Sequence, residues 1–170
     1  MSEGKHAEIE RKYLIAMPNE ALLRSRQGCA VWEIEQTYLM AQQGETRRVR
    51  RVSENGENRY YRTFKRPVSA LTSEEDEAEI DERADRAYLK EIDPSLRPIL
   101  KTRYRIPWNA KLLEVDLYPF WRDRAILEIE LQSETEGVSL PEWLRLIREV
   151  TEDHRYKNVS LAREIVMEEI

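Results

Sequence analysis

The sequence predicts a β-rich α+β protein in which eight strands close a barrel with a charged interior and helices packed outside. Eight segments have the composition and alternation of β-strands, and eight strands are enough to close a barrel. In seven of these segments charged side chains recur at every second position, and amphipathic helical patterns lie between and after the strands. Such helices can cover an apolar outer surface while the charged faces turn inward.

The predicted strands are separated by short turn-like segments. They cover residues 7–15, 31–42, 45–53, 58–66, 73–81, 98–106, 110–118 and 124–133. The stretch SENGEN, at residues 53–58, is typical of a hairpin turn, because Asn-Gly readily adopts the backbone angles that a tight turn requires. The third and fourth predicted strands are therefore expected to pair directly.

Four segments have helical periodicity. They are residues 18–27, 81–92, 140–150 and the C-terminal stretch around 162–166. The segment 140–150 opens with Pro141, which suits the first turn of a helix. The apolar stripes of the last three segments consist of Ala84, Tyr88 and Ile92, of Leu140, Trp143, Leu144 and Ile147, and of Ala162, Ile165 and Val166.

Length and composition favour one domain that spans residues 1–170. The chain is 41% hydrophobic and shows no repeat or linker that would divide it. No apolar run is long enough to cross a membrane and the first residues lack the pattern of a signal peptide, so we expect a cytoplasmic protein without a membrane partner. Because Cys29 is the single cysteine, an internal disulfide and a zinc site with several thiolates are excluded.

The net charge of -5 gives no electrostatic reason to bind nucleic acid, although four arginines cluster between residues 47 and 51. Two of them, Arg47 and Arg51, are expected on the outer face of their strand. His6 and His154 are far apart in sequence, and no motif joins them. We therefore expect neither histidine to act as a ligand or catalytic group.

The alternation of charge is clearest in the stretch EIERK. Side chains alternate across a strand, so Glu8, Glu10 and Lys12 must lie on one face. The same spacing recurs in Arg48 and Arg50, Thr63 and Lys65, Glu75, Glu77 and Glu79, Lys101 and Arg103, Glu114 and Asp116, and Glu128 and Glu130. In the last two of these strands the opposite face is plainly apolar.

A single pair of like charges at this spacing is more often a solvated face, or a charge that protects a sheet edge from aggregation. Seven strands with the same spacing favour another interpretation. If helices cover the apolar faces, the charged faces must meet inside the barrel. Glu33 and Glu35 repeat the spacing in the remaining strand, but Ile34, Gln36 and Tyr38 are expected to face inward there.

A charged interior requires a ligand. Two carboxylates about 5 Å apart repel by roughly 3 kcal/mol at an effective dielectric constant near 20. Carboxylates without histidine or thiolate partners favour hard cations such as Mg²⁺ or Mn²⁺. Guanidinium groups suit a polyanion with many oxygens, such as phosphate. A phosphate chain that is bridged to the carboxylates by metal ions satisfies both kinds of side chain.

Eight short motifs, taken in order, resemble the CYTH superfamily, whose members are also called triphosphate tunnel metalloenzymes. They are EIERK, RVR at 48–50, TFK at 63–65, EDEAEI at 75–80, KTRY at 101–104, EVD at 114–116, EIEL at 128–131 and DHRYKNVSLA at 153–162. The resemblance implies an antiparallel eight-stranded barrel, open at both ends, that holds a triphosphate and divalent metal ions in its tunnel.

The resemblance also implies roles for individual residues. The implied metal ligands are Glu8, Glu10, Asp116, Glu128 and Glu130. The implied phosphate contacts are Lys12, Arg48, Arg50, Lys65, Lys101, Arg103 and Lys157. Glu75 and Glu77 are expected to orient the attacking water, with the more central role for Glu77, and Lys65 is expected to assist the water or the leaving oxygen.

The predicted function is metal-dependent hydrolysis of a triphosphate, with Mg²⁺ or Mn²⁺ as cofactor and a triphosphate-containing small molecule as partner. Inorganic tripolyphosphate is the expected substrate, because no stretch resembles an adenine-binding motif. The alternatives are an adenylyl cyclase of class IV type, a thiamine or nucleoside triphosphatase, and a module that binds polyphosphate or nucleotide without catalysis. A homodimer through the outer helices is also expected.

Overall fold

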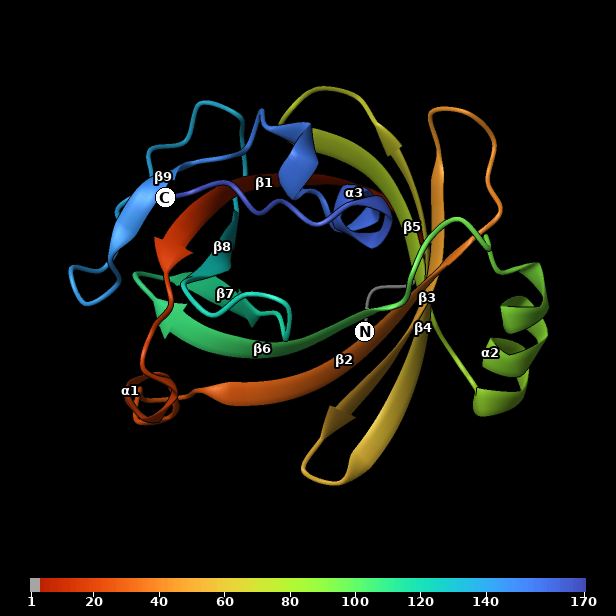
Figure 1. Ribbon diagram of the computed structural model, residues 1–170, viewed down its shortest axis with the longest axis horizontal. Helices are drawn as coiled ribbons and strands as arrows, with labels where there is room; N and C mark the ends of the chain where they lie inside the picture. Colours follow the sequence, from red (N-terminus) through yellow and green to blue (C-terminus); the bar gives the residue numbers. More distant parts are fainter. Residues whose placement is uncertain (1–3) are drawn as a thin grey trace.

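The computed structural model describes residues 4–170 and confirms the closed barrel (Figure 1). The strands are β1 (Gly4–Ala16), β2 (Ala30–Leu39), β3 (Thr46–Glu54), β4 (Glu57–Pro67), β5 (Thr72–Ile80), β6 (Ile99–Trp108), β7 (Lys111–Leu117), β8 (Arg124–Glu130) and β9 (Leu146–Glu149). The helices are α1 (Glu20–Arg24), α2 (Glu82–Tyr88) and α3 (Asn158–Arg163), with 3-10 turns at Leu89–Glu91 and His154–Tyr156.

Eight antiparallel strands form the barrel in the order β5-β4-β3-β2-β6-β7-β8-β1, and β1 closes it by pairing with β5. The first half of β1, from Gly4 to Ile9, pairs with β5, and the residues from Glu10 onward pair with β8. All eight predicted strands are confirmed, with boundaries that differ by a few residues. Side chains in the first half of β1 therefore lie beside those of β5, and side chains in the second half lie beside those of β8.

The hairpin between β3 and β4 is the predicted one. Glu54 and Glu57 are Cα partners across the turn, and Asn55 and Gly56 between them have φ angles of 50° and 81°. Both angles lie in the left-handed region that a two-residue hairpin turn requires. The register of this hairpin sends Arg48 and Arg50 to the inner face of the barrel, and sends Arg47 and Arg51 to the outer face.

The helix predicted at residues 140–150 is wrong. This segment contains turns followed by β9, which pairs with the part of β1 between Tyr13 and Ile15. Because β5 leaves β1 after Ile9, the backbone groups of that edge need other partners, and β9 supplies them. The apolar residues Trp143 and Leu144 still pack on the core, as their spacing indicates, but they do so from a turn.

The C-terminal helix lies earlier in the chain than predicted. Helix α3 ends at Arg163, and Ile165 and Val166 follow in irregular chain that still packs against the core. Helix α1 has five residues, within the predicted 18–27, and Asn19 caps its first turn. Among residues 4–170, no helix is long and apolar enough to span a membrane.

One hydrophobic core lies outside the barrel wall. It gathers the outward faces of β1, β6, β7 and β8, including Tyr13, Leu113, Val115, Leu127 and Ile129, all of which are at most 7% exposed. Helix α1 and the segment before β9 cover it, while α2 lies outside β3 and β4 (Figure 1). The apolar faces of the strands therefore point outward, which leaves their charged faces for the interior.

A second core closes one end of the barrel. Here Leu14 and Ile126 face inward and pack with Tyr156 and Leu161 of the C-terminal segment. Figure 1 shows α3 within the ring of strands. The expectation of a tunnel open at both ends is therefore wrong for this chain, because its C-terminal segment covers the end at which β1 finishes.

Candidate active site

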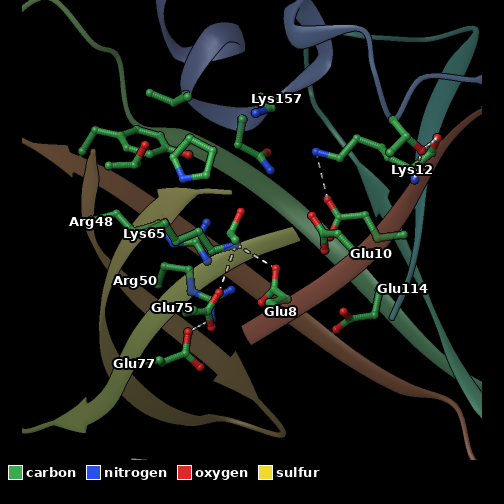
Figure 2. Close-up of a pocket in the computed structure, with 18 of the residues that line it drawn as sticks. Glu8, Glu10, Lys12, Arg48, Arg50, Lys65, Glu75, Glu77, Glu114 and Lys157 are labelled. Carbon is green, nitrogen blue, oxygen red and sulfur yellow. Dashed lines mark hydrogen bonds and ion pairs between the residues drawn. The ribbon is translucent and has the colours of Figure 1, made fainter. Parts of the chain in front are cut away.

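The charged inner faces surround a cavity of about 580 Å³ (Figure 2). Twelve of the fourteen predicted site residues line it: Glu8, Glu10, Lys12, Arg48, Arg50, Lys65, Glu75, Glu77, Lys101, Arg103, Glu128 and Lys157. Eleven of these come from strands, and Lys157 comes from the C-terminal segment at the covered end. The alternation of the strands therefore brings the predicted set together.

Lys65 lies between two carboxylates at the junction of β1 and β5. Its Nζ atom is 2.9 Å from Glu8 Oε1 and 3.1 Å from Glu75 Oε2 (Figure 2). Burial alone would lower the pKa of Lys65, but the carboxylate of Glu8 outweighs this and raises it. Lys65 is therefore a protonated donor at neutral pH and is unsuited to act as a base.

The two carboxyl groups beside Lys65 differ. Burial would raise the pKa of Glu8, but Lys65 lowers it below its usual range. Burial and the neighbouring Glu8 carboxyl raise the pKa of Glu75 to about 7. Glu8 is therefore the ionised member of the pair, and Glu75 can exchange a proton near neutral pH.

Glu77 is held by its neighbours. Its Oε2 atom accepts a hydrogen bond of 2.8 Å from Thr63 Oγ1 and lies 3.3 Å from Arg50 Nη2. Burial would raise the pKa of Glu77, but Arg50 and the Thr63 hydroxyl outweigh it and lower the pKa. The carboxylate is thus ionised and fixed, and its more central catalytic role stays a prediction.

Asp116 does not line the cavity. It is fully buried, and its two oxygens accept hydrogen bonds from Arg103 Nε and Nη2 at 2.7 and 2.8 Å, while Lys101 Nζ donates at 2.8 Å. Arg103 and Asp116 are Cα partners across β6 and β7, which sets this geometry. In this structure Asp116 positions two basic side chains, and its predicted role as a metal ligand stays a prediction.

Glu130 also lies outside the cavity lining. Its side chain is exposed at the end of β8, beside its Cα partner Glu10. Burial and the nearby carboxylates of Glu8 and Glu114 raise its pKa. Glu130 therefore stands at the rim of the acidic group, where its role as a metal ligand stays a prediction.

Glu10 is a carboxylate of the cavity that has no basic partner among residues 4–170. Among residues 4–170 no basic side chain lies within 4.0 Å of its oxygens and no group donates a hydrogen bond to them, although the side chain faces the cavity. Burial, then Glu128 and Glu8, raise the pKa of Glu10 to about 8. A carboxylate crowded by two others, without a cation of its own, is the arrangement that a bound metal ion relieves.

The neighbouring carboxylate of Glu128 has a basic side chain beside each of its oxygens. Lys12 Nζ lies 3.4 Å from Glu128 Oε1, and Arg103 Nη2 lies 3.4 Å from Glu128 Oε2. Burial would raise the pKa of Glu128, but Lys12 and Arg103 lower it below its usual range. The chain therefore gives Glu128 two basic neighbours, whereas among residues 4–170 Glu10 has none within 4.0 Å.

Two basic side chains of the cavity form no ion pair within the described part of the chain. They are Arg48 and Lys157, and the Nε atom of Arg48 is also buried without a hydrogen-bond partner. Burial, together with Lys12 and Lys65, lowers the pKa of Lys157. Burial likewise lowers the pKa of Lys101 to about 8 despite Asp116. Arg48 and Lys157 can therefore donate hydrogen bonds to an anion in the cavity.

The lining as a whole holds eight basic residues and seven glutamates. A polyphosphate in such a nearly balanced set would leave an excess of negative charge, which divalent cations can offset. The partnerless oxygens of Glu10 and the donor set of carboxylates without thiolate fit a hard divalent ion. Glu8, Glu10 and Glu128 are the residues from which such an ion would take its protein ligands.

Sequence reasoning missed several lining residues. Arg105 lines the cavity beside Glu114, with Nε 3.1 Å from Glu114 Oε2, and stacks 4.0 Å over the ring of Trp32. Arg105 follows Lys101 and Arg103 at two-residue spacing, so the alternation that found those residues also predicts it. Tyr61 lines the same end of the cavity, and no charge pattern marks it or Trp32.

His6 was expected to have no role, and the structure places it among acidic groups. Its Nε2 atom is 3.8 Å from Glu75 Oε1, and His6, Glu8 and Glu75 offer ligand atoms that lie within 4.8 Å of one another. His6 precedes Glu8 by two residues on β1, so extending the alternation by one step finds it. His154 has no such neighbours among the described side chains.

The residues expected on the outer face lie there. Glu35 accepts a hydrogen bond of 2.6 Å from Arg51, and Glu33 accepts one of 2.9 Å from Thr102, both outside the cavity. Arg47 Nη1 lies 2.9 Å from Glu91 Oε1 in the turn that follows α2. Charged residues of the same types thus serve ordinary surface pairs on one face and line the cavity on the other.

Comparison with known proteins gives independent evidence on the family of this chain. A model of the CYTH domain family matches residues 6–165, nearly the whole chain. Comparison with curated protein sequences gives no match.

Several solved structures share the fold. The inorganic triphosphatase NE1496 is 28% identical with a TM-score of 0.56, and the match covers 93% of this chain and 95% of that one. The PH1819 protein from Pyrococcus horikoshii is 20% identical with a TM-score of 0.58, covering 75% and 80% of the two chains. A putative adenylate cyclase from Bacillus halodurans is 17% identical with a TM-score of 0.54, covering 77% and 83%. The last two support the fold alone.

Proposed function

This chain belongs to the CYTH domain family, and we propose that it is a metal-dependent triphosphatase that cleaves inorganic tripolyphosphate to pyrophosphate and phosphate. The observation that carries the proposal is the pairing of unsatisfied groups in one cavity. Among residues 4–170, Arg48 and Lys157 form no ion pair, and no basic side chain lies within 4.0 Å of the Glu10 oxygens. A phosphate chain linked to a divalent cation completes both.

The basic side chains would hold the phosphate chain. Arg48 and Arg50 have buried Nε atoms with no hydrogen-bond partner, so each has a donor to offer to a phosphate oxygen. Charge-assisted hydrogen bonds from guanidinium groups are among the strongest that proteins form. Lys157, on the C-terminal segment, would meet the end of the chain nearest the covered end of the barrel.

Glu8, Glu10 and Glu128 would supply the protein ligands for Mg²⁺ or Mn²⁺. A bound ion of this kind neutralises charge on phosphate oxygens and fixes their orientation. Because Glu10 has a pKa of about 8, it must lose a proton before it can bind a cation at neutral pH. Metal binding should therefore release protons.

Hydrolysis requires a water molecule in line with the terminal phosphorus. Its oxygen bonds to that phosphorus while the bond to the bridging oxygen breaks, and pyrophosphate departs. Glu75, with a pKa of about 7, suits acceptance of the proton from the water, and the ionised Glu77 would help to orient it. Lys65, which stays protonated, would stabilise charge that develops on the phosphate oxygens.

Tripolyphosphate fits the dense charge of the interior, since every group described above can contact phosphate, metal or water. An organic triphosphate is the second candidate. Trp32 and Tyr61 line the cavity near its uncovered end and offer ring surfaces to an aromatic group. The related NE1496 structure is called an inorganic triphosphatase, which favours the first candidate.

The test is product analysis with tripolyphosphate, ATP and thiamine triphosphate under matched Mg²⁺ and Mn²⁺. We expect tripolyphosphate to yield pyrophosphate and phosphate much faster than ATP is consumed, and we expect no appreciable cyclic AMP. Cyclic AMP as the main product from ATP, with tripolyphosphate left intact, would favour a cyclase. Binding of all three compounds without turnover would instead indicate a non-catalytic module.

A further inference from the structure

A group of potential metal ligands that includes an imidazole lies where β1 pairs with β5. His6 and Glu8 lie two residues apart on β1, and Glu75 on β5 is the Cα partner of His6. The three side chains offer ligand atoms within 4.8 Å of one another. The backbone pairing of β1 with β5 therefore holds the three side chains close to one another.

The contact between His6 and Glu75 is too long for a hydrogen bond. The Nε2 atom of His6 lies 3.8 Å from Glu75 Oε1, whereas hydrogen-bonded nitrogen and oxygen atoms lie about 2.7–3.2 Å apart. Two atoms bound to one cation at about 2.1 Å lie roughly 3–3.5 Å apart. A small movement of an exposed imidazole would bring the pair to that separation.

Lys65 leaves part of this carboxylate pair unsatisfied. It contacts Glu8 through Oε1 and Glu75 through Oε2, so each carboxylate keeps a second oxygen. Glu75 is 4% exposed, and its Oε2 atom has no hydrogen-bond partner even though Lys65 Nζ lies 3.1 Å away. A carboxylate buried this deeply, with incomplete hydrogen bonding, points to a further ligand in the site.

We infer that His6, Glu8 and Glu75 form a binding site for a borderline divalent metal ion such as Co²⁺ or Zn²⁺. One imidazole nitrogen with two carboxylate oxygens suits these ions, whereas Mg²⁺ prefers oxygen ligands and water. The site shares Glu8 with the all-oxygen group of Glu8, Glu10 and Glu128, and it differs from that group in containing a nitrogen ligand. His6, at the exposed end of β1, gives an incoming ion a route from solvent.

Three protein ligands leave further positions on the ion for water or for a phosphate oxygen. The ion would sit beside Lys65 at the wall of the same cavity, so it would determine which metal supports the proposed hydrolysis. The inference does not depend on that hydrolysis, because the site is read from metal binding in the absence of phosphate. Failure of one proposal therefore leaves the other standing.

The chain has two histidines, which gives the experiment an internal control. Substoichiometric Zn²⁺ is added to the unsubstituted protein without phosphate, and the nitrogen NMR signals of the imidazole rings are followed after assignment with His6→Gln. We expect the signal of a His6 ring nitrogen to shift, because direct metal coordination changes it, while the signals of the His154 ring stay in place. Shifts in both rings together, or in neither, would overturn the inference.

Binding constants test the ligand set. Titration with Co²⁺, followed by its visible absorption, should give one site in the unsubstituted protein and at least a tenfold weaker one in His6→Gln. Glu75→Gln should weaken Co²⁺ binding as well, while His154→Gln should leave it unchanged. Mg²⁺ affinity, measured calorimetrically, should change less than about twofold in His6→Gln.

Unchanged Co²⁺ binding in His6→Gln, or an equal loss of Co²⁺ and Mg²⁺ affinity, would overturn the inference. So would the same loss in His154→Gln. The NMR measurement uses the unsubstituted protein and stays decisive if a variant folds poorly.

Discussion

Strand β3 carries four arginines, two on each face, and the faces use them differently. Arg47 and Arg51 point outward and pair with glutamates on the surface. Arg48 and Arg50 point into the cavity, where the Nε atom of each is buried without a hydrogen-bond partner. Neighbouring arginines on one strand therefore differ: the outer two have ion-pair partners, whereas each of the inner two has a buried donor without a hydrogen-bond partner.

The arginine side chains contribute differently to folding stability on the two faces. An exposed ion pair such as that of Arg51 contributes about 0.2–1 kcal/mol to stability. A buried donor left without a partner costs about 1–3 kcal/mol. The buried Nε donors of Arg48 and Arg50 therefore need an acceptor from outside the protein, which water or a bound anion can supply. Unsatisfied charge is the feature that separates a binding face from a solvated one.

The prediction with the largest expected effect tests this difference between the inner and outer arginines directly. Arg50→Ala should lower kcat/KM for tripolyphosphate by about 10²–10³-fold, the loss typical of removing one donor from a charged transition state. Arg51→Ala should change kcat/KM less than about twofold, because its side chain faces Glu35 outside the barrel. Steady-state kinetics on both variants provides the measurement. Equal damage from the two would mean that the inner face is not the binding face.

The second prediction applies the comparison to carboxylates. Glu10→Gln should abolish most activity and weaken Mg²⁺ binding, since it removes an oxygen ligand, while Glu35→Gln on the outer face should leave both intact. Because the pKa of Glu10 is about 8, its side chain is largely neutral at pH 7 without metal, so glutamine should not disturb the fold.

Calorimetric Mg²⁺ titration and circular dichroism check this second prediction. Excess chelator should abolish phosphate release by the unsubstituted protein, and added Mg²⁺ or Mn²⁺ should restore it. Full activity in excess chelator would contradict the metal dependence.

A smaller effect concerns stability and pH. In the folded, metal-free protein the pKa values of Glu10 and Glu75 are raised from 4.5 to about 8 and about 7. The folded state then binds more protons than the unfolded chain from about pH 5 to 8, so the free energy of unfolding falls as pH rises through this window. Carboxylates with lowered pKa values change the free energy of unfolding only at pH values below this window.

We expect the Tm of metal-free protein to fall by at least about 2 °C between pH 5.5 and pH 8.5, which corresponds to roughly 1 kcal/mol in a domain of this size. Glu10→Gln should flatten that dependence. Thermal unfolding followed by circular dichroism at several pH values is the check. A Tm that rises across the window would contradict the raised pKa values.

The inner faces were predictable because the signal is local. Side-chain alternation depends only on strand geometry, so Arg48 and Lys65 could be assigned to one interior without knowing which strands pair. The same rule, carried one step further along β1 and β6, would have found His6 and Arg105.

Long-range pairing was not predictable in the same way. Residues 146–149 have spacing compatible with a helix, and they form β9 because the edge of β1 beyond Ile9 needs backbone partners. The engagement of Asp116 by Arg103 depends on their facing each other across β6 and β7. The C-terminal cover likewise depends on packing between Leu14 and Leu161, which are far apart in sequence.

The central claim is that the charged interior binds a phosphate chain through divalent metal. The most direct measurement is a crystal structure with Mn²⁺ and a tripolyphosphate analogue whose bridging oxygens are replaced by NH. We predict phosphate oxygens within hydrogen-bond distance of Arg48 and Arg50, and an anomalous Mn²⁺ peak at about 2.1–2.2 Å from a Glu10 oxygen. An analogue bound only to Arg47 or Arg51 on the outer face, with the interior free of phosphate and Mn²⁺, would contradict it.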